Sequence, residues 1–427
     1  INDMLFTVVD QLNRGKDCIT EEKERLQLAM LNLKAGEKAM SLATFFNSAS
    51  YLKAGIDVLC DGHWERCYDL SLQLHNLYSE AEYCNGHFQE VALVTEVVIE
   101  QARSFHHKLR IYATLIKLLA AQNKLHEAMQ IGFDVLKKLG VPFPSPLPDT
   151  SNAVRKAMTT SMVLQNKSKE EFLNYHEMND ENMTAAMKFL QILLNYSFLA
   201  KQEHLPVIID QMMQLTLRFG VCKESCAALG YLSFLLCSFE DFKESDHIGQ
   251  LAILLLDKLK AKELLSQVYV VYFAGAASWM RGVKLTLDSL LHGYQVGMQT
   301  GDIENAMFNA HVYVIESFIY GRSLSELERE ADSFIKQMIE YKQMAPKDMT
   351  LAVQHVILSL KNDPSLMVCQ NAQQKDLLER AIENNNVVVA SYIYSLSGIE
   401  AYIFGKYESA ASMVQKRKEM EKQMSRK

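Results

Sequence analysis

The sequence predicts an all-α protein in which antiparallel helical hairpins of similar size stack along one axis as an α-solenoid. Three observations support this fold class. Proline and glycine are scarce, with 7 and 18 residues in a chain of 427, whereas helix-forming residues abound. Short turn motifs recur at a nearly constant spacing. Hydrophobic residues make up 49% of the chain, which is enough for a continuous core between stacked hairpins.

The clearest internal repeat combines a turn residue, a large apolar residue two positions later and a smaller residue three positions after that. Its two copies are Gly86, Phe88 and Val91, and then Asn123, Leu125 and Ala128. Phe88 and Leu125 are 37 residues apart, and one further step back leads to Tyr51, followed by Ala54. Glycine or asparagine accepts the left-handed backbone that ends a helix, and the apolar residue then opens the next helix.

The last copy of the pattern lies near the carboxyl end, in Tyr394, Gly398, Ala401, Gly405, Tyr407 and Ala410. These residues have the spacings of a tetratricopeptide repeat, which the segment resembles. Phe242 and Ser245 belong to a weaker copy that lacks the turn glycine. One such match would also fit an ordinary helical hairpin, but several at regular spacing favour a repeat array.

Residues 1–140 are predicted to form the first block of repeats. A short helix over residues 1–13 precedes hairpins with helices at 35–47 and 51–59, 68–83 and 88–104, and 105–122 and 125–139. In this assignment Tyr51 opens the second helix of its hairpin. Phe88 and Tyr407 are both expected on the buried side of their helices.

A proline-rich linker is predicted next, over residues 141–180. Pro142, Pro144, Pro146 and Pro148 cannot lie in a helix interior, so they interrupt the array. Two short polar helices, at 151–164 and 169–176, should follow. The linker is interpreted as a bridge between two blocks, and a proline-rich ligand for another protein is the alternative.

Residues 181–427 are predicted to form the second block. Phe242, Val283 and Leu324 should each open the second helix of a hairpin, because they are spaced by 41 residues. Ile303 to Phe318 has the apolar spacing of a core-facing helix. The final hairpin should run over 387–416. The apolar runs at 268–280 and 387–404 are interpreted as buried helices, since the first is too short to span a bilayer and the second contains Glu400.

Composition also limits the function. The net charge of −7 gives no general attraction to nucleic acid or anionic membranes, so neither nucleic-acid binding nor membrane insertion is expected. Eight cysteines without a disulfide framework favour a reducing cytoplasm. Cys60, His63 and Cys67, with Cys84 and His87 nearby, are residue types that bind zinc. They flank repeat turns, however, so buried thiols and an exposed histidine are preferred and no metal site is predicted.

A series of short motifs follows the chain in order: Glu21-Glu22, Arg25-Leu26, Asn32-Leu33, Ala35-Gly36, Lys38-Ala39, Tyr51-Leu52-Lys53-Ala54-Gly55, Trp64-Glu65, Tyr68-Asp69-Leu70, Leu72-Gln73-Leu74, Leu139-Gly140-Val141, Phe219-Gly220 and Gln299-Thr300-Gly301-Asp302-Ile303-Glu304. From about Ile1 to Pro364 the chain resembles the helical region that follows the nucleotide-binding module in predicted ATPases of the STAND type. In that family the region belongs to hybrid signalling proteins with serine/threonine-kinase-like and histidine-kinase domains. A first residue of Ile rather than Met agrees with a piece of a longer polypeptide.

The chemistry of that family needs motifs that this chain lacks. A phosphate-binding loop of the Gly-x-x-x-x-Gly-Lys-Ser/Thr kind is absent, and so are the kinase loops His-Arg-Asp and Asp-Phe-Gly. No catalytic residue and no cofactor are therefore predicted. We expect a regulatory scaffold that binds a ligand or a protein segment, in particular neighbouring domains of the same polypeptide, and couples it to attached ATPase or kinase domains. A free-standing adaptor that binds peptide segments is the alternative, and a helical enzyme is a third, weaker hypothesis.

Overall fold

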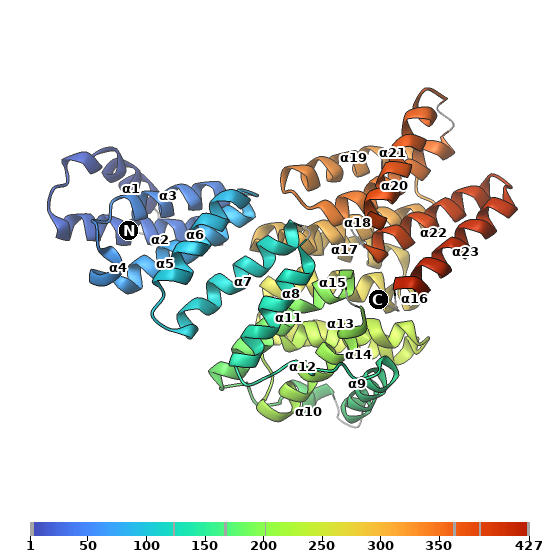
Figure 1. Ribbon diagram of the computed structural model, residues 1–427, viewed down its shortest axis with the longest axis horizontal. Coiled ribbons are helices and arrows are strands. Elements are labelled where there is room, and N and C mark those ends of the chain that lie inside the picture. The colour runs from blue at the N-terminus through green and yellow to red at the C-terminus, as the bar shows by residue number, and fades with distance from the viewer. Residues whose placement is uncertain are drawn as a thin grey trace. The chain divides into compact units, whose positions relative to one another are not determined.

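The computed structural model describes residues 4–122, 124–165, 169–200, 202–361, 364–383 and 386–424, which form helices joined by short turns (Figure 1). Within these ranges no β-strand occurs, and strand-like pairing is limited to an isolated bridge between Glu177 and Val221. The predicted fold class, an all-α stack of helical hairpins, is confirmed. Asn123 lies outside the described residues.

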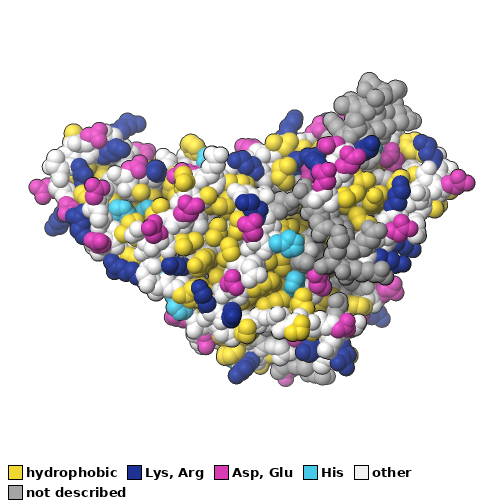
Figure 2. Space-filling view, viewed as in Figure 1, with side chains coloured by type: hydrophobic (Ala, Val, Ile, Leu, Met, Phe, Trp, Pro, Cys, Tyr) yellow, Lys and Arg dark blue, Asp and Glu magenta, His cyan; other side chains and the backbone are white. Residues whose placement is uncertain are grey.

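The chain divides into two compact units. The first comprises Ile1–Pro142 with Met298–Gly301, and the second comprises Phe143–Gly297 with Asp302–Lys427. The four prolines at 142–148 lie in the non-helical stretch between the last helix before residue 140 and the helix that begins at Thr150. Figure 2 shows Lys and Arg side chains interspersed with Asp and Glu on the visible face, in keeping with the modest net charge of −7.

The helices of the first unit are α1 (Leu5–Arg14), α2 (Glu22–Ser41), α3 (Phe45–Asp57), α4 (His63–Arg66), α5 (Tyr68–Cys84), α6 (Phe88–Gln101), α7 (Phe105–Ala121) and α8 (Leu125–Lys138). Helices α2 and α3, α5 and α6, and α7 and α8 pair as hairpins, and α3 packs on α5 while α6 packs on α7. Leu28, Leu52, Leu74, Val98 and Ile111 are buried between them. The second and third predicted hairpins agree with these helices to within a few residues.

The first predicted hairpin has the wrong boundaries. Helix α2 continues through Ala35 to Ser41, and α3 already begins at Phe45. Tyr51 and Ala54 therefore lie in the middle of α3 and do not open it. Ala43, with a φ of 56°, is the left-handed residue of this turn. Because alanine holds this position, the turn lacks the Gly or Asn that the repeat pattern predicts.

Several hairpin turns share one hydrogen-bond pattern, although their sequences differ. The residue after the left-handed position donates its N–H to the carbonyl oxygen five residues earlier, which is the Schellman arrangement. These bonds join Thr44 to Ala39 at 3.0 Å, His87 to Glu82 at 3.0 Å, Asp241 to Leu236 at 3.2 Å and Lys406 to Ala401 at 2.8 Å. Gly86 and Gly405 hold the left-handed position as predicted, whereas Glu240 holds it before Phe242.

The helices of the second unit are α9 (Thr150–Gln165), α10 (Lys169–Leu173), α11 (Glu181–Ala200), α12 (Leu205–Phe219), α13 (Ser225–Ser238), α14 (Phe242–Leu259), α15 (Leu265–Ala274), α16 (Ala276–Met280), α17 (Val283–Thr300, except its last residues), α18 (Ile303–Ile319), α19 (Leu324–Glu340), α20 (Met344–Leu360), α21 (Pro364–Glu383), α22 (Val387–Ile403) and α23 (Tyr407–Met424). The predicted helix starts at Phe242, Val283 and Leu324 are confirmed. Ile303, Met307, Ala310 and Val314 are buried, as the apolar spacing of this helix predicts.

Six helices of the second unit form a closed series of contacts. Helix α11 contacts α13, which contacts α15, and the series continues through α18 and α20 to α22. Helix α22 then contacts α11 again. Five of these helices begin a hairpin whose second helix is α12, α14, α19, α21 or α23; Figure 1 shows α22 and α23 side by side. The stack of the second unit thus curves until its ends meet, and an inner surface results.

Among the described residues, no helix combines the length and the apolar character that crossing a bilayer requires.

Candidate binding cavity

A cavity of about 330 Å³ lies on the inner surface of the second unit, and all six helices of the closed series line it. This volume falls at the lower end of the range of roughly 300–1,000 Å³ that is usual for ligand pockets. Most of its wall is apolar, formed by Phe198, Leu199, Phe234, Val270, Val271, Ala274, Phe308, Val312, Ile315 and Met349. Lys and Arg do not occur among the described residues that line it.

An amide cluster forms one polar part of the wall. Asn195 on α11 accepts hydrogen bonds at its Oδ1 from the Tyr231 hydroxyl at 2.6 Å and from Gln267 Nε2 at 3.0 Å. Its Nδ2 donates to Asn305 Oδ1 on α18 at 3.2 Å. The cluster links four helices, α11, α13, α15 and α18, and satisfies its own polar groups, so it stabilises this part of the wall.

A second polar part contains His311, Glu316 and Tyr392. Glu316 lies three helical turns beyond Asn305 on α18, about 16 Å along the helix axis at 1.5 Å per residue. Tyr392 on α22 packs edge to face on His311, with ring centroids 5.2 Å apart. The Tyr392 hydroxyl is buried and has no hydrogen-bond partner among the described residues.

Burial controls the charge of these three groups. It lowers the pKa of His311, which is 2% exposed, to about 3, so the imidazole is neutral near pH 7. Nδ1 of His311 lies 3.1 Å from the Thr350 hydroxyl. Burial also raises the pKa of Glu316, against the weaker effect of a hydrogen bond from Ser278 Oγ at 3.4 Å. Burial and the nearby Glu316 charge both raise the pKa of Tyr392.

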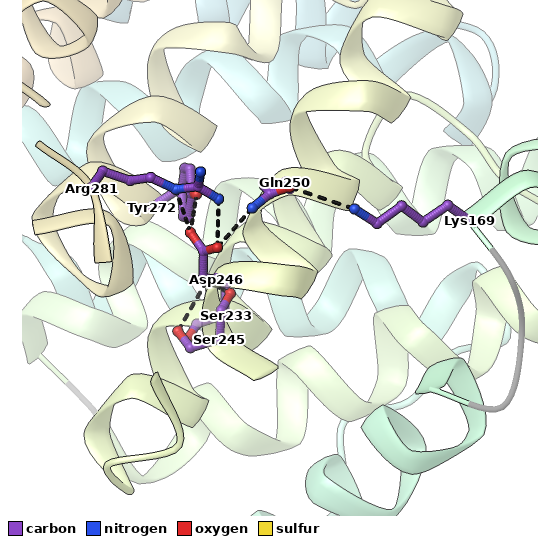
Figure 3. Close-up of polar contacts among 7 residues, drawn as sticks. All are labelled: Lys169, Ser233, Ser245, Asp246, Gln250, Tyr272 and Arg281. Carbon is purple, nitrogen blue, oxygen red and sulfur yellow. Dashed lines mark hydrogen bonds and ion pairs between the residues drawn. The ribbon is translucent and has the colours of Figure 1, made fainter. Parts of the chain in front are cut away.

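Another carboxylate of this unit, the buried Asp246 on α14, is saturated with donors (Figure 3). Tyr272 donates to it at 2.6 Å, Gln250 at 2.7 Å, and Arg281 at 2.9 and 2.5 Å. Burial would raise the pKa of Asp246, but the hydrogen bonds from Arg281 and Tyr272 lower it overall. A carboxylate so completely paired joins α14, α15 and the end of α16, and it offers nothing to a ligand.

The predicted repeat positions lie in turns and helix packing, away from this cavity. Gly86 and Gly405 have φ values of 72° and 71°. Phe88, Val91, Ala128 and Gly398 are buried, and Leu125, Phe242 and Ala410 are half-buried. The expectation that Tyr407 is buried is wrong, since 64% of it is exposed. Phe88, at the equivalent position, packs with Leu118 of the next hairpin, and no helix described after α23 covers Tyr407 in this way.

Sequence reasoning missed the cavity residues. The apolar stripe of Ile303 to Phe318 was evident, but Asn305, His311 and Glu316 lie beside it on the same helix. Polar residues at helical spacing next to a core stripe were the one available signal. Which of them would meet Asn195 or Tyr392 depends on how far the array curves.

The residues considered for zinc have other partners. His63 Nδ1 lies 2.8 Å from the Ser71 hydroxyl, and Cys67 Sγ donates to the His63 carbonyl oxygen at 3.3 Å. His87 Nδ1 lies 2.5 Å from Glu82 Oε2. The part of the chain that the structure describes contains no group of three or more His, Cys, Asp or Glu side chains that could hold a metal ion.

Comparison with known proteins gives partial similarity. No protein-family model matches the chain. It is 25% identical over 146 residues to hybrid signal transduction histidine kinase G of Dictyostelium discoideum, which covers 32% of this chain and only 4% of that relative. A crystal structure of a Rap protein complexed with competence and sporulation factor aligns with a TM-score of 0.47 and 10% identity, over 94% of this chain and 99% of the Rap chain. Similarity to STAND-type ATPases remains a prediction.

Proposed function

We propose that this chain is a non-catalytic regulatory region of a larger signalling protein. It binds a ligand or a protein segment within the second unit and couples binding to attached kinase or ATPase domains. Neighbouring domains of the same polypeptide, in the cytoplasm, are the proposed partners. The partial similarity to a hybrid histidine kinase supports the signalling context, although the chain spans a small fraction of that protein.

The observation that carries this proposal is the cavity itself. Each of the six helices in the closed series contributes to its wall, from α11 to α22. In a repeat array each hairpin contacts mainly its neighbours, so a change at one hairpin normally spreads by short steps. A ligand in this cavity would contact all six helices together and would favour one curvature of the array. The free energy of ligand binding would thereby shift the array toward that curvature.

The test fills the cavity in the full-length protein. Ala274 lines the cavity on α15, and Ala274→Phe should occupy the space that a ligand needs. The matched control is Ala411→Phe on α23, where Ala411 is exposed. We expect Ala274→Phe to make phosphorylation activity of the parent protein independent of its signal, and Ala411→Phe to leave the response intact.

An unchanged signal response in the Ala274→Phe protein, with the variant folded by circular dichroism, would contradict the proposal. A reading frame with a start near Ile1 and a stop codon just after Lys427 would favour the free-standing adaptor instead.

A further inference from the structure

The cavity of the second unit combines a carboxylate, a tyrosine hydroxyl and aromatic walls. We propose that it binds an organic cation, an apolar group that ends in an ammonium, with the cation held between Glu316 and Tyr392. This inference rests on the proposed function, since it names the ligand class of the same cavity. The cation would belong either to a free amine or to a lysine side chain of a bound peptide.

Tyr392 provides the first argument. Its hydroxyl is buried in the cavity wall and has no hydrogen-bond partner among the described residues. Buried hydroxyls are nearly always paired, because an unpaired one has lost its water without replacement. Glu316 is close enough for its charge to raise the pKa of Tyr392, yet the two side chains form no hydrogen bond. Both residues line the same cavity, so an ammonium bound there would supply N–H donors to two oxygens that do not bond to each other.

Glu316 provides the second argument. Its only hydrogen bond within the described part of the chain comes from Ser278 at 3.4 Å, and no Lys or Arg side chain there forms an ion pair with it. Asp246, the comparable carboxylate, has four donor contacts of 2.9 Å or shorter. Glu316 therefore keeps acceptor capacity that its own unit does not use. A half-buried carboxylate such as Glu316 is stabilised most by a cation with hydrogen-bond donors.

The remaining wall selects a cation over an anion. Phe198 and Phe234 meet edge to face at 5.6 Å, and Phe308 adds a third ring. Aromatic faces attract cations through their negative quadrupole. His311 is neutral near pH 7 because burial lowers its pKa to about 3, so it does not repel a cation. An anion would meet Glu316 without any Lys or Arg among the described lining residues to compensate.

The experiment compares two probes that share one apolar body. 4-Phenylbutylammonium carries the charge and 4-phenylbutanol does not, and their dissociation constants with the whole chain are measured by isothermal titration calorimetry. We expect the amine to bind about tenfold more tightly, as one charge-assisted hydrogen bond allows. Glu316→Gln should remove this difference and leave the alcohol unchanged. Glu340→Gln, at an exposed position on α19, is the matched control.

A second variant keeps the test independent of folding defects. Tyr392→Phe retains the ring and removes only the unpaired hydroxyl, so the protein should be at least as stable while the amine binds several-fold more weakly. The source of the cation is tested with acetyl-Phe-Lys-Phe-amide against its norleucine counterpart. Preference for the lysine peptide indicates a protein segment, and binding of the free amine alone indicates a small ligand.

Equal binding of amine and alcohol would overturn the inference, as would an amine preference that survives Glu316→Gln. If both probes bind equally and Ala274→Phe abolishes their binding, the cavity is an apolar site and only the cation assignment fails. If neither probe nor peptide binds the wild-type chain, the inference is wrong.

Discussion

Gly249 illustrates how one missing side chain positions a polar network. A Cβ atom at this position would lie 2.1 Å from Cδ2 of Tyr272. The Tyr272 ring therefore packs directly on the backbone of α14, and its hydroxyl reaches Asp246 at 2.6 Å. Glycine is required here for close approach and not for a turn.

Gly249→Ala should therefore destabilise the second unit by about 1–3 kcal/mol, the usual effect of overpacking. Urea unfolding measures this difference. Gly282→Ala is the control, because a Cβ at Gly282 meets nothing within 4 Å. Equal stability of the two variants would mean that the Tyr272 ring can move away without loss.

His311 makes stability depend on pH. Burial lowers its pKa in the folded protein to about 3 from the ordinary 6.5, so the unfolded chain binds the proton more tightly. The contribution of His311 to the free energy of unfolding is fully present above pH 6.5. It falls by about 1.4 kcal/mol for each pH unit below that value.

The prediction is tested with His311→Gln. Between pH 7 and pH 5 the wild type should lose about 2 kcal/mol more of its unfolding free energy than this variant does. His126→Gln, at an exposed position on α8, should behave as the wild type. Parallel pH profiles for wild type and His311→Gln would show that the imidazole accepts a proton in the folded state.

Phe88 and Tyr407 hold the same place in their repeats but differ in burial. Phe88 is 9% exposed and stacks on Tyr83, with ring centroids 5.8 Å apart. Phe88→Ala should reduce the unfolding free energy by about 3–5 kcal/mol. Tyr407→Ala should change it by well under about 1 kcal/mol, as exposed substitutions usually do. Thermal or urea unfolding of both variants provides the comparison, and a large effect at Tyr407 would place it against another part of the protein.

At the scale of elements, the hairpin turn is defined by hydrogen bonds more than by residue type. Glu240 adopts a φ of 63° between α13 and α14, and Ala43 a φ of 56° between α2 and α3. Both are strained for a residue with a Cβ atom, by roughly 1–2 kcal/mol. The Schellman bonds and the packing of the two helices hold them there.

Replacing Glu240 by glycine should release this strain. Glu240→Gly is expected to stabilise the second unit by up to about 1 kcal/mol, since part of the gain is offset by the entropy of glycine in the unfolded chain. Lys243→Gly, three residues later within α14, should destabilise it, because there the backbone is helical. Chemical denaturation distinguishes the two, and a loss of stability at Glu240 would show that its side chain contributes more than its backbone strain removes.

At the scale of the whole molecule, the second unit depends on closure. Helices α11 and α22 are separated by most of the unit's sequence, yet they contact each other and face one cavity. Asn195, His311 and Tyr392 share a wall only because the array curves through the intervening hairpins. This closure gives the inner surface its carboxylate, its unpaired hydroxyl and its aromatic rings together.

Local patterns in the sequence were sufficient for the helices. The spacing of Phe242, Val283 and Leu324 predicted three helix starts, because each is determined by residues within one turn of it. The same reasoning failed for the helix that contains Tyr51. The turn before that helix has Ala43 at the left-handed position, which usually needs glycine. It also failed for the burial of Tyr407, which depends on whether another hairpin covers it.

The sequence by itself determined the fold class, most helix boundaries and the lack of known phosphate-binding or kinase loops. Only the tertiary structure decided where the array closes, and therefore which polar side chains meet in the cavity. The physical reason is that helix formation depends on contacts within a few residues, whereas the curvature of a stack is the sum of small rotations at many helix interfaces. No single segment of the chain encodes that sum.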